Sequence, residues 1–147
     1  MVDRYLSRPL ELPEPGHEFD RADLVFYDVD HSGPTFEGRI FIGRSGLKHG
    51  AGVDHPAYAG SLYVFGHGSC HGDVGHCDVP TEHDPFDYRL PHHLEPAAHT
   101  VTVTDSIKRL VAEKKATAKV AVFAHGPDGK ALKALDFTTL RLFTYAG

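Results

Sequence analysis

Histidine and cysteine side chains gather in one short segment of this sequence. Residues 67–77 read His-Gly-Ser-Cys-His-Gly-Asp-Val-Gly-His-Cys, so that two residues separate His67 from Cys70, while His76 and Cys77 are adjacent. Four glycines within or next to this run let the backbone wrap around a small ion. Imidazole and thiolate are ligands that copper and zinc prefer, whereas magnesium and calcium prefer oxygen. The segment therefore predicts a transition-metal site, with copper as the expected metal and zinc as the alternative.

Further candidate ligands lie at the ends of predicted strands and at the far end of the loop that contains this run. His31 and His67 each follow a strand, so both are expected at one rim of the fold, held by rigid elements. The spacing leaves open whether His71, His92 or His93 completes the site. The expected metal ligands are His31, His67, Cys70, His76, Cys77 and His92. The histidines expected to be solvated or structural are His17, His49, His55, His83, His99 and His125.

The two cysteines allow more than one interpretation. They are the only cysteines in the chain, and they suit either one disulfide bridge or one pair of metal ligands. Inert thiols are a third possibility, and a reducing cytosol disfavours the disulfide. Asp73 and Asp78 are the nearest carboxylates that could orient a ligand imidazole by accepting its hydrogen bond.

The elements that must position these groups are short strands with apolar and β-branched residues. They are expected over residues 22–29, 36–42, 58–65, 99–105, 117–125 and 131–145, the last of these as one strand or a pair of strands. One helix of about three turns should follow the fourth strand, with Thr104 or Asp105 as its N-cap. Several short strands with turn signals and one helix predict a mostly β fold, an antiparallel β-sandwich or barrel.

The segment 66–98 shows neither the helical nor the strand period. It contains four prolines, six of the twelve histidines and both cysteines. A loop of this length inside a compact domain is usually functional or disordered. Because it holds few apolar residues, it needs another source of ordering free energy, which a bound metal can supply. We therefore expect a metal-binding loop.

Length and composition indicate one domain and exclude several partners. The 147 residues are enough for one core, expected over residues 19–147, with residues 1–18 as a proline-rich extended arm. A net charge of -5 without a basic stripe argues against nucleic acid. No apolar run is long enough to span a bilayer or to act as a signal core, so we expect a cytoplasmic protein without a membrane partner.

Three stretches of the chain resemble a known domain. They are YAGSLYVFGH at 58–67, TVTVTDSIKRL at 100–110 and AKVAVFAHGPDGKALKALDFTTLRL at 118–142. In this order they resemble the C-terminal β-sandwich domain of plant polyphenol oxidases and of tyrosinase-like bacterial proteins. The resemblance covers roughly residues 19–145. It implies a sandwich fold and an association with copper.

The catalytic residues of that family cannot be carried over to this chain. In the family, two sets of three histidines hold a dicopper centre inside a separate helical bundle, and this sequence contains no such bundle. The Cys-x-His motif of that bundle is absent as well, since Cys70 and Cys77 each lie directly beside a histidine. Phenol oxidation by a coupled copper pair is therefore not implied.

Three functions follow as hypotheses from different classes. The leading one is a copper-dependent oxidoreductase with an open coordination position, acting on a small phenolic or thiol-bearing molecule or on dioxygen. The second is a non-catalytic module that delivers copper or docks on a protein partner, as a free-standing relative of the domain that covers a tyrosinase active site. The third is a structural zinc protein, in which a zinc ion with a closed set of Cys and His ligands cross-links the loop.

Overall fold

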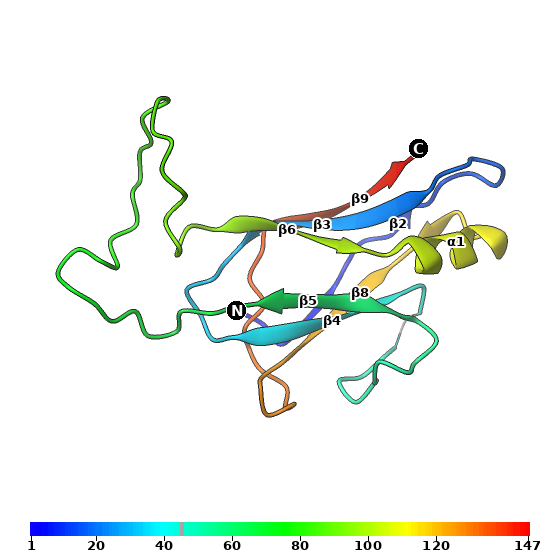
Figure 1. The fold of residues 1–147 in the computed structure, drawn as a ribbon. Coiled ribbons are helices and arrows are strands. Elements are labelled where there is room, and N and C mark those ends of the chain that lie inside the picture. Colours follow the sequence, from blue (N-terminus) through cyan, green and yellow to red (C-terminus); the bar gives the residue numbers. More distant parts are fainter. Residues whose placement is uncertain (45) are drawn as a thin grey trace.

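Two antiparallel sheets pack face to face in this protein (Figure 1). The computed structural model describes residues 1–44 and 46–147. One sheet has the order β1 (Arg4–Leu6), β8 (Val120–His125), β4 (Phe36–Ile42) and β5 (Tyr58–Val64). The other has the order β6 (Ala97–Thr102), β3 (Arg21–Val29) and β9 (Thr139–Tyr145). A small ribbon pairs β2 (Leu10–Glu11) with β7 (Thr117–Ala118), and the helix α1 spans Thr104–Ala112.

The predicted sandwich is confirmed, and the barrel alternative is wrong. Both large sheets are open, because their strand orders end on β1 and β5 in one sheet and on β6 and β9 in the other. The N-terminal arm contributes β1 to the first sheet, where Tyr5 pairs with Val122. Within the described residues, no helix is long and apolar enough to cross a membrane.

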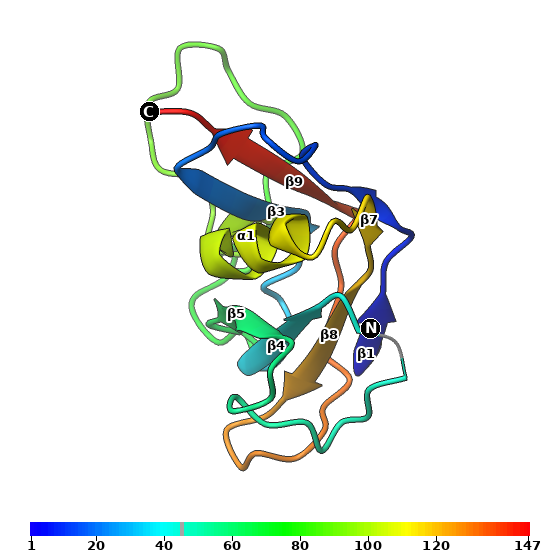
Figure 2. The same ribbon diagram turned by 90° about the vertical axis from the view of Figure 1, so that its right-hand side faces the viewer.

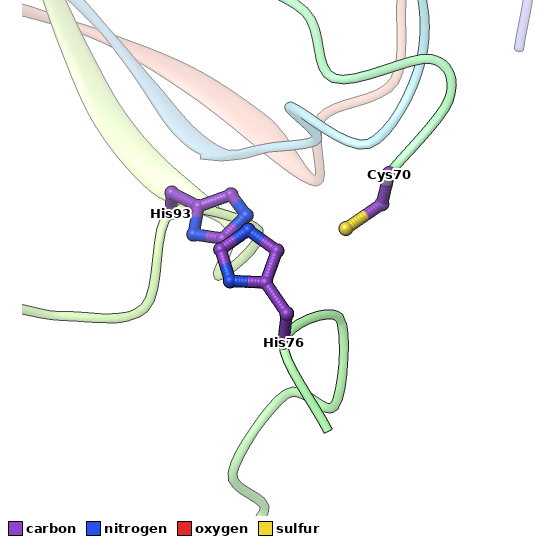
Figure 3. A group of neighbouring side chains, drawn as sticks. All are labelled: Cys70, His76 and His93. Atoms are coloured by element: carbon purple, nitrogen blue, oxygen red, sulfur yellow. The ribbon is translucent and has the colours of Figure 1, made fainter. Parts of the chain in front are cut away.

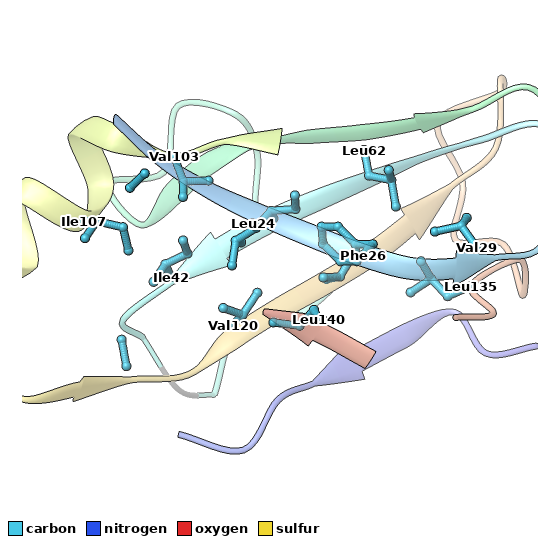
Figure 4. Close-up of a cluster of buried hydrophobic side chains, with 14 of the residues drawn as sticks. Leu24, Phe26, Val29, Ile42, Leu62, Val103, Ile107, Val120, Leu135 and Leu140 are labelled. Carbon is cyan, nitrogen blue, oxygen red and sulfur yellow. The ribbon is translucent and has the colours of Figure 1, made fainter. Parts of the chain in front are cut away.

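The core fills the space between the sheets (Figure 4). Strand β3 lies in the middle of its sheet, and Leu24 and Phe26 point from it into the core with no exposed surface. Ile40 of β4 and Val122 of β8 meet them from the opposite sheet, equally buried. The period-2 alternation of a strand places each of these apolar side chains on the inner face.

Helix α1 closes one end of the sandwich, between the two sheets (Figure 2). Its residues Ile107 and Leu110 are buried against the core. The N-cap is Val103, so the prediction of Thr104 or Asp105 was wrong. The hydroxyl of Thr104 instead accepts a hydrogen bond from the backbone N–H of Ala22 at 3.1 Å, which ties the helix to β3 rather than capping it.

Three connections between the two large sheets lie at the opposite end of the sandwich. The chain crosses from β3 to β4 over residues 30–35, from β5 to β6 over 65–96, and from β8 to β9 over 126–138. The last crossing explains why only residues 139–145 of the predicted 131–145 form a strand. The second crossing is the long loop, which projects from the sandwich at the end away from α1 (Figure 1). Histidines in these connections are thereby brought to one rim.

Candidate metal site

His93 lies at the centre of a group of imidazoles in the long loop. Its ring centroid is 4.3 Å from that of His92, 4.9 Å from that of His67 and 5.1 Å from that of His76. Partial desolvation, together with repulsion from His92, His67 and His76, lowers the pKa of His93 below its usual value of 6.5. A lowered pKa favours the neutral imidazole, which is the form that binds a metal ion.

Cys70, His76 and His93 bring three potential ligand atoms together (Figure 3). The sulfur of Cys70 and one ring nitrogen of each histidine all lie within 4.8 Å of one another. Cys70 is half-buried, whereas His76 is exposed, so the group opens to solvent. The predicted ligands Cys70 and His76 are thus neighbours in space, and His93 joins them from the far end of the loop. His67 lies beside this group through the contact between its ring and that of His93.

The start of the loop is fastened to the rim by backbone contacts. The backbone N–H of His67 donates to the carbonyl of His31 at 2.8 Å, and that of Gly66 donates to the hydroxyl of Thr35 at 3.0 Å. Gly66 packs so tightly against the backbone of Gly33 and Pro34 that a Cβ would overlap with it. These contacts fix where the His67 side chain begins.

His92 braces the loop in this structure. Its Nε2 lies 3.0 Å from the carbonyl oxygen of His76 and is therefore protonated and donating, while its Nδ1 accepts from the backbone N–H of Leu94 at 3.2 Å. Both ring nitrogens of His92 are engaged. Its predicted role as a ligand stays a prediction that would require one of these bonds to open.

His31 faces His99 instead of the group around His93. The Nε2 atoms of the two rings are 2.7 Å apart, one donating and the other accepting. Burial lowers the pKa of both imidazoles, with a further lowering of His31 by His67 and of His99 by His31. His99 was expected to be solvated or structural. Its pairing with His31 spans 68 residues of sequence, and only the relative placement of β3 and β6 could have revealed it.

The histidine pair predicts a stability that depends on pH. Because the pKa of His31 and His99 is lowered by folding, the unfolded chain takes up protons near pH 6.5 while the folded chain resists them. The free energy of unfolding should therefore fall as pH drops from about 6.5 towards the lower folded pKa values. Urea unfolding of the wild type and His99→Gln at pH 7.5 and 5.5 measures this. The variant should lose less stability than the wild type, and an equal loss in both would contradict the prediction.

Cys70 and Cys77 are joined in a disulfide, with their Cα atoms 6.0 Å apart. In this state neither sulfur is a thiolate, so their predicted role as metal ligands stays a prediction for the reduced protein. Asp73 and Asp78 use their backbones in turns, where Asp73 accepts from the N–H of His76 at 3.0 Å and Asp78 donates to the carbonyl of Gly75 at 3.2 Å. An orienting role for their carboxylates stays a prediction as well.

The class of protein that these observations define is an antiparallel β-sandwich with a histidine-rich rim. No family model and no curated protein matches the sequence. The structure is similar to a recombinantly expressed latent aurone synthase, a polyphenol oxidase, with a TM-score of 0.59 and 12% identity over 99% of this chain and 25% of that chain. The same enzyme from its natural source gives a TM-score of 0.58 and 12% identity over 97% and 24%.

These comparisons confirm the predicted resemblance to a polyphenol oxidase domain at the level of the fold. At 12% identity they show the fold alone. This chain spans about a quarter of the length of the enzymes it matches.

Proposed function

We propose that this chain is a copper-binding protein in which His67, His76 and His93 hold the ion and leave one coordination position open. The observation that carries the proposal is the packing of the His93 ring against the rings of both His67 and His76. Imidazole nitrogen is a preferred donor for copper, and three such donors leave room for a further ligand.

The donor geometry is compatible with a transition metal. Metal–nitrogen bonds of about 2.0–2.1 Å place two donors on one ion at most about 4.2 Å apart. Within the proposed set, a ring nitrogen of His76 and one of His93 lie within 4.8 Å of each other, so movements of under about 1 Å would bring this pair to binding distance. His67 would complete the set from beside His93, since their ring centroids are 4.9 Å apart. The fold likeness to polyphenol oxidases supports copper over zinc.

The proposed activity is oxidation or reduction of a small phenolic or thiol-bearing molecule. Copper, when bound, would supply the electron-transfer chemistry and a position for dioxygen or substrate. The chain itself would hold the ion through its imidazoles and keep it accessible, since His76 is exposed to solvent. The backbone contact between His67 and His31 would anchor the site to the sandwich.

A non-catalytic copper-delivery or docking module is the second candidate. Two observations favour it: the exposed position of His76, from which a partner could take the ion, and the match to only a quarter of each polyphenol oxidase chain. Structural zinc in a closed Cys/His shell would need Cys70 and Cys77 as thiolates, and so belongs to the reduced protein. The expected cytoplasmic location also belongs to that form, because disulfides persist mainly in oxidising compartments.

Elemental analysis of protein purified without a histidine tag tests the proposal. We expect about one copper ion per chain, and azide added to the cupric form should change its visible and paramagnetic spectra because a coordination position is open. Oxygen uptake with a simple phenol or thiol, above that of free copper, would separate the enzyme from the module. A chain that retains no copper, or a spectrum indifferent to azide, would contradict the open copper site.

A further inference from the structure

The disulfide lies inside the group of potential ligands. The sulfur of Cys70 is within 4.8 Å of a ring nitrogen of His76 and of His93 (Figure 3), and Cys77 directly follows His76 in the chain. The bridge therefore keeps His76 close to Cys70. At the same time the disulfide bond engages the sulfur of Cys70, which lies beside the imidazoles of His76 and His93.

We propose that the Cys70–Cys77 pair is a redox-dependent part of the metal site, which sets whether the ion is held by imidazoles alone or by imidazoles and a thiolate. This inference rests on the proposed function for the histidines. With the bridge closed, His67, His76 and His93 hold the ion. With the bridge open, the thiolate of Cys70 joins His76 and His93 in the same place.

The change of ligand follows from the chemistry of sulfur. A disulfide sulfur carries no charge and binds metal ions poorly, whereas a thiolate is a soft ligand that selects Cu(I) and Zn(II). Two molecules of a small thiol supply the two electrons and two protons: the S–S bond breaks, Cys70 and Cys77 become thiols, and the reductant leaves as its own disulfide. Binding of the ion then displaces the proton of Cys70.

The surroundings of the bridge give a small thiol access to it. Ser69 and residues 71–76 are exposed, and both cysteines are only half-buried. Thiol–disulfide exchange requires such access for the attacking thiolate. Opening the bridge leaves the sandwich core untouched, because both cysteines lie outside the buried cluster.

Metal titration of the oxidised and the reduced protein tests the inference. The probes are Zn(II) and, under anaerobic conditions, Cu(I), each titrated against a chromophoric chelator after the reductant has been removed. We expect reduction to raise the affinity for both ions by at least about tenfold, with sulfur-to-metal absorption in the ultraviolet. Cys77→Ser, which leaves Cys70 free, should bind like the reduced wild type without any reductant.

Cys70→Ser is the matched variant, because it also lacks the bridge and keeps only the sulfur of Cys77, which does not belong to the group of Cys70, His76 and His93. It should bind like the oxidised wild type at best. Equal affinity in the oxidised and reduced wild type, or tight binding by Cys70→Ser, would overturn the inference while leaving a histidine site that binds Cu(II) in the oxidised protein. Failure of the oxidised protein to bind Cu(II) would overturn the proposed function and this inference together.

Discussion

Replacing His93 by alanine is expected to lower the copper affinity of the oxidised protein by at least about 100-fold. Loss of a group that merely orients a ligand already costs about 10- to 100-fold in affinity, and a direct ligand should cost no less. His93 is the imidazole that contacts both His67 and His76, so its removal deletes one proposed donor and the ring that both of the others contact. Competition with a chromophoric chelator measures the affinity, and circular dichroism reports on the sandwich.

His83→Ala is the control for this experiment. The His83 side chain is 56% exposed and lies 3.4 Å from a carboxylate oxygen of Glu95, in the same loop but outside the group around His93. Copper affinity should be unchanged in His83→Ala, and the circular dichroism of both variants should match the wild type. Full copper retention by His93→Ala would show that copper binds elsewhere in the protein. The half-buried pair of His31 and His99 would then be the next place to test.

The strands could be predicted because their signal is local. The segment 36–42 was predicted with the bounds that the structure gives, and 22–29 and 58–65 each differ by one residue at one end. Alternating apolar residues show which side chains face the core, but they do not show which strands pair. The arm of residues 1–18 contains β1, whose pairing with β8 joins segments more than a hundred residues apart.

Only part of the site could be predicted, because the sequence shows which residues are close along the chain and not which segments meet in the fold. The run of residues 67–77 was visible because its histidines and cysteines are close in sequence. His93 belongs to the group only because the loop returns to the rim, and the pairing of His31 with His99 depends on how β3 and β6 lie side by side. The state of Cys70 and Cys77 depends on redox conditions as well as on sequence.

Replacing Gly66 by alanine should damage both the fold and the site. A Cβ at residue 66 would lie 2.5 Å from the carbonyl oxygen of Pro34, and closer still to the carbonyl oxygen of Gly33 and the carbonyl carbon of Pro34. These are backbone atoms, so no side-chain rotation can relieve the overlap and the connections 30–35 and 65–96 must separate. We expect a loss of about 3 kcal/mol in the free energy of unfolding. For a domain of this size this lowers Tm by roughly 6–12 °C.

The same separation should weaken copper binding, because His67 follows Gly66 directly and its backbone N–H donates to the carbonyl of His31. Gly50→Ala is the matched control: a Cβ at residue 50 meets open space, and its backbone is outside the left-handed region. Calorimetry measures the Tm of both variants, and copper titration measures their copper affinity. A Gly66→Ala protein with wild-type Tm and wild-type copper affinity would show that the close approach at the rim does not position His67, whereas losses confined to Gly66→Ala would tie the site to that contact.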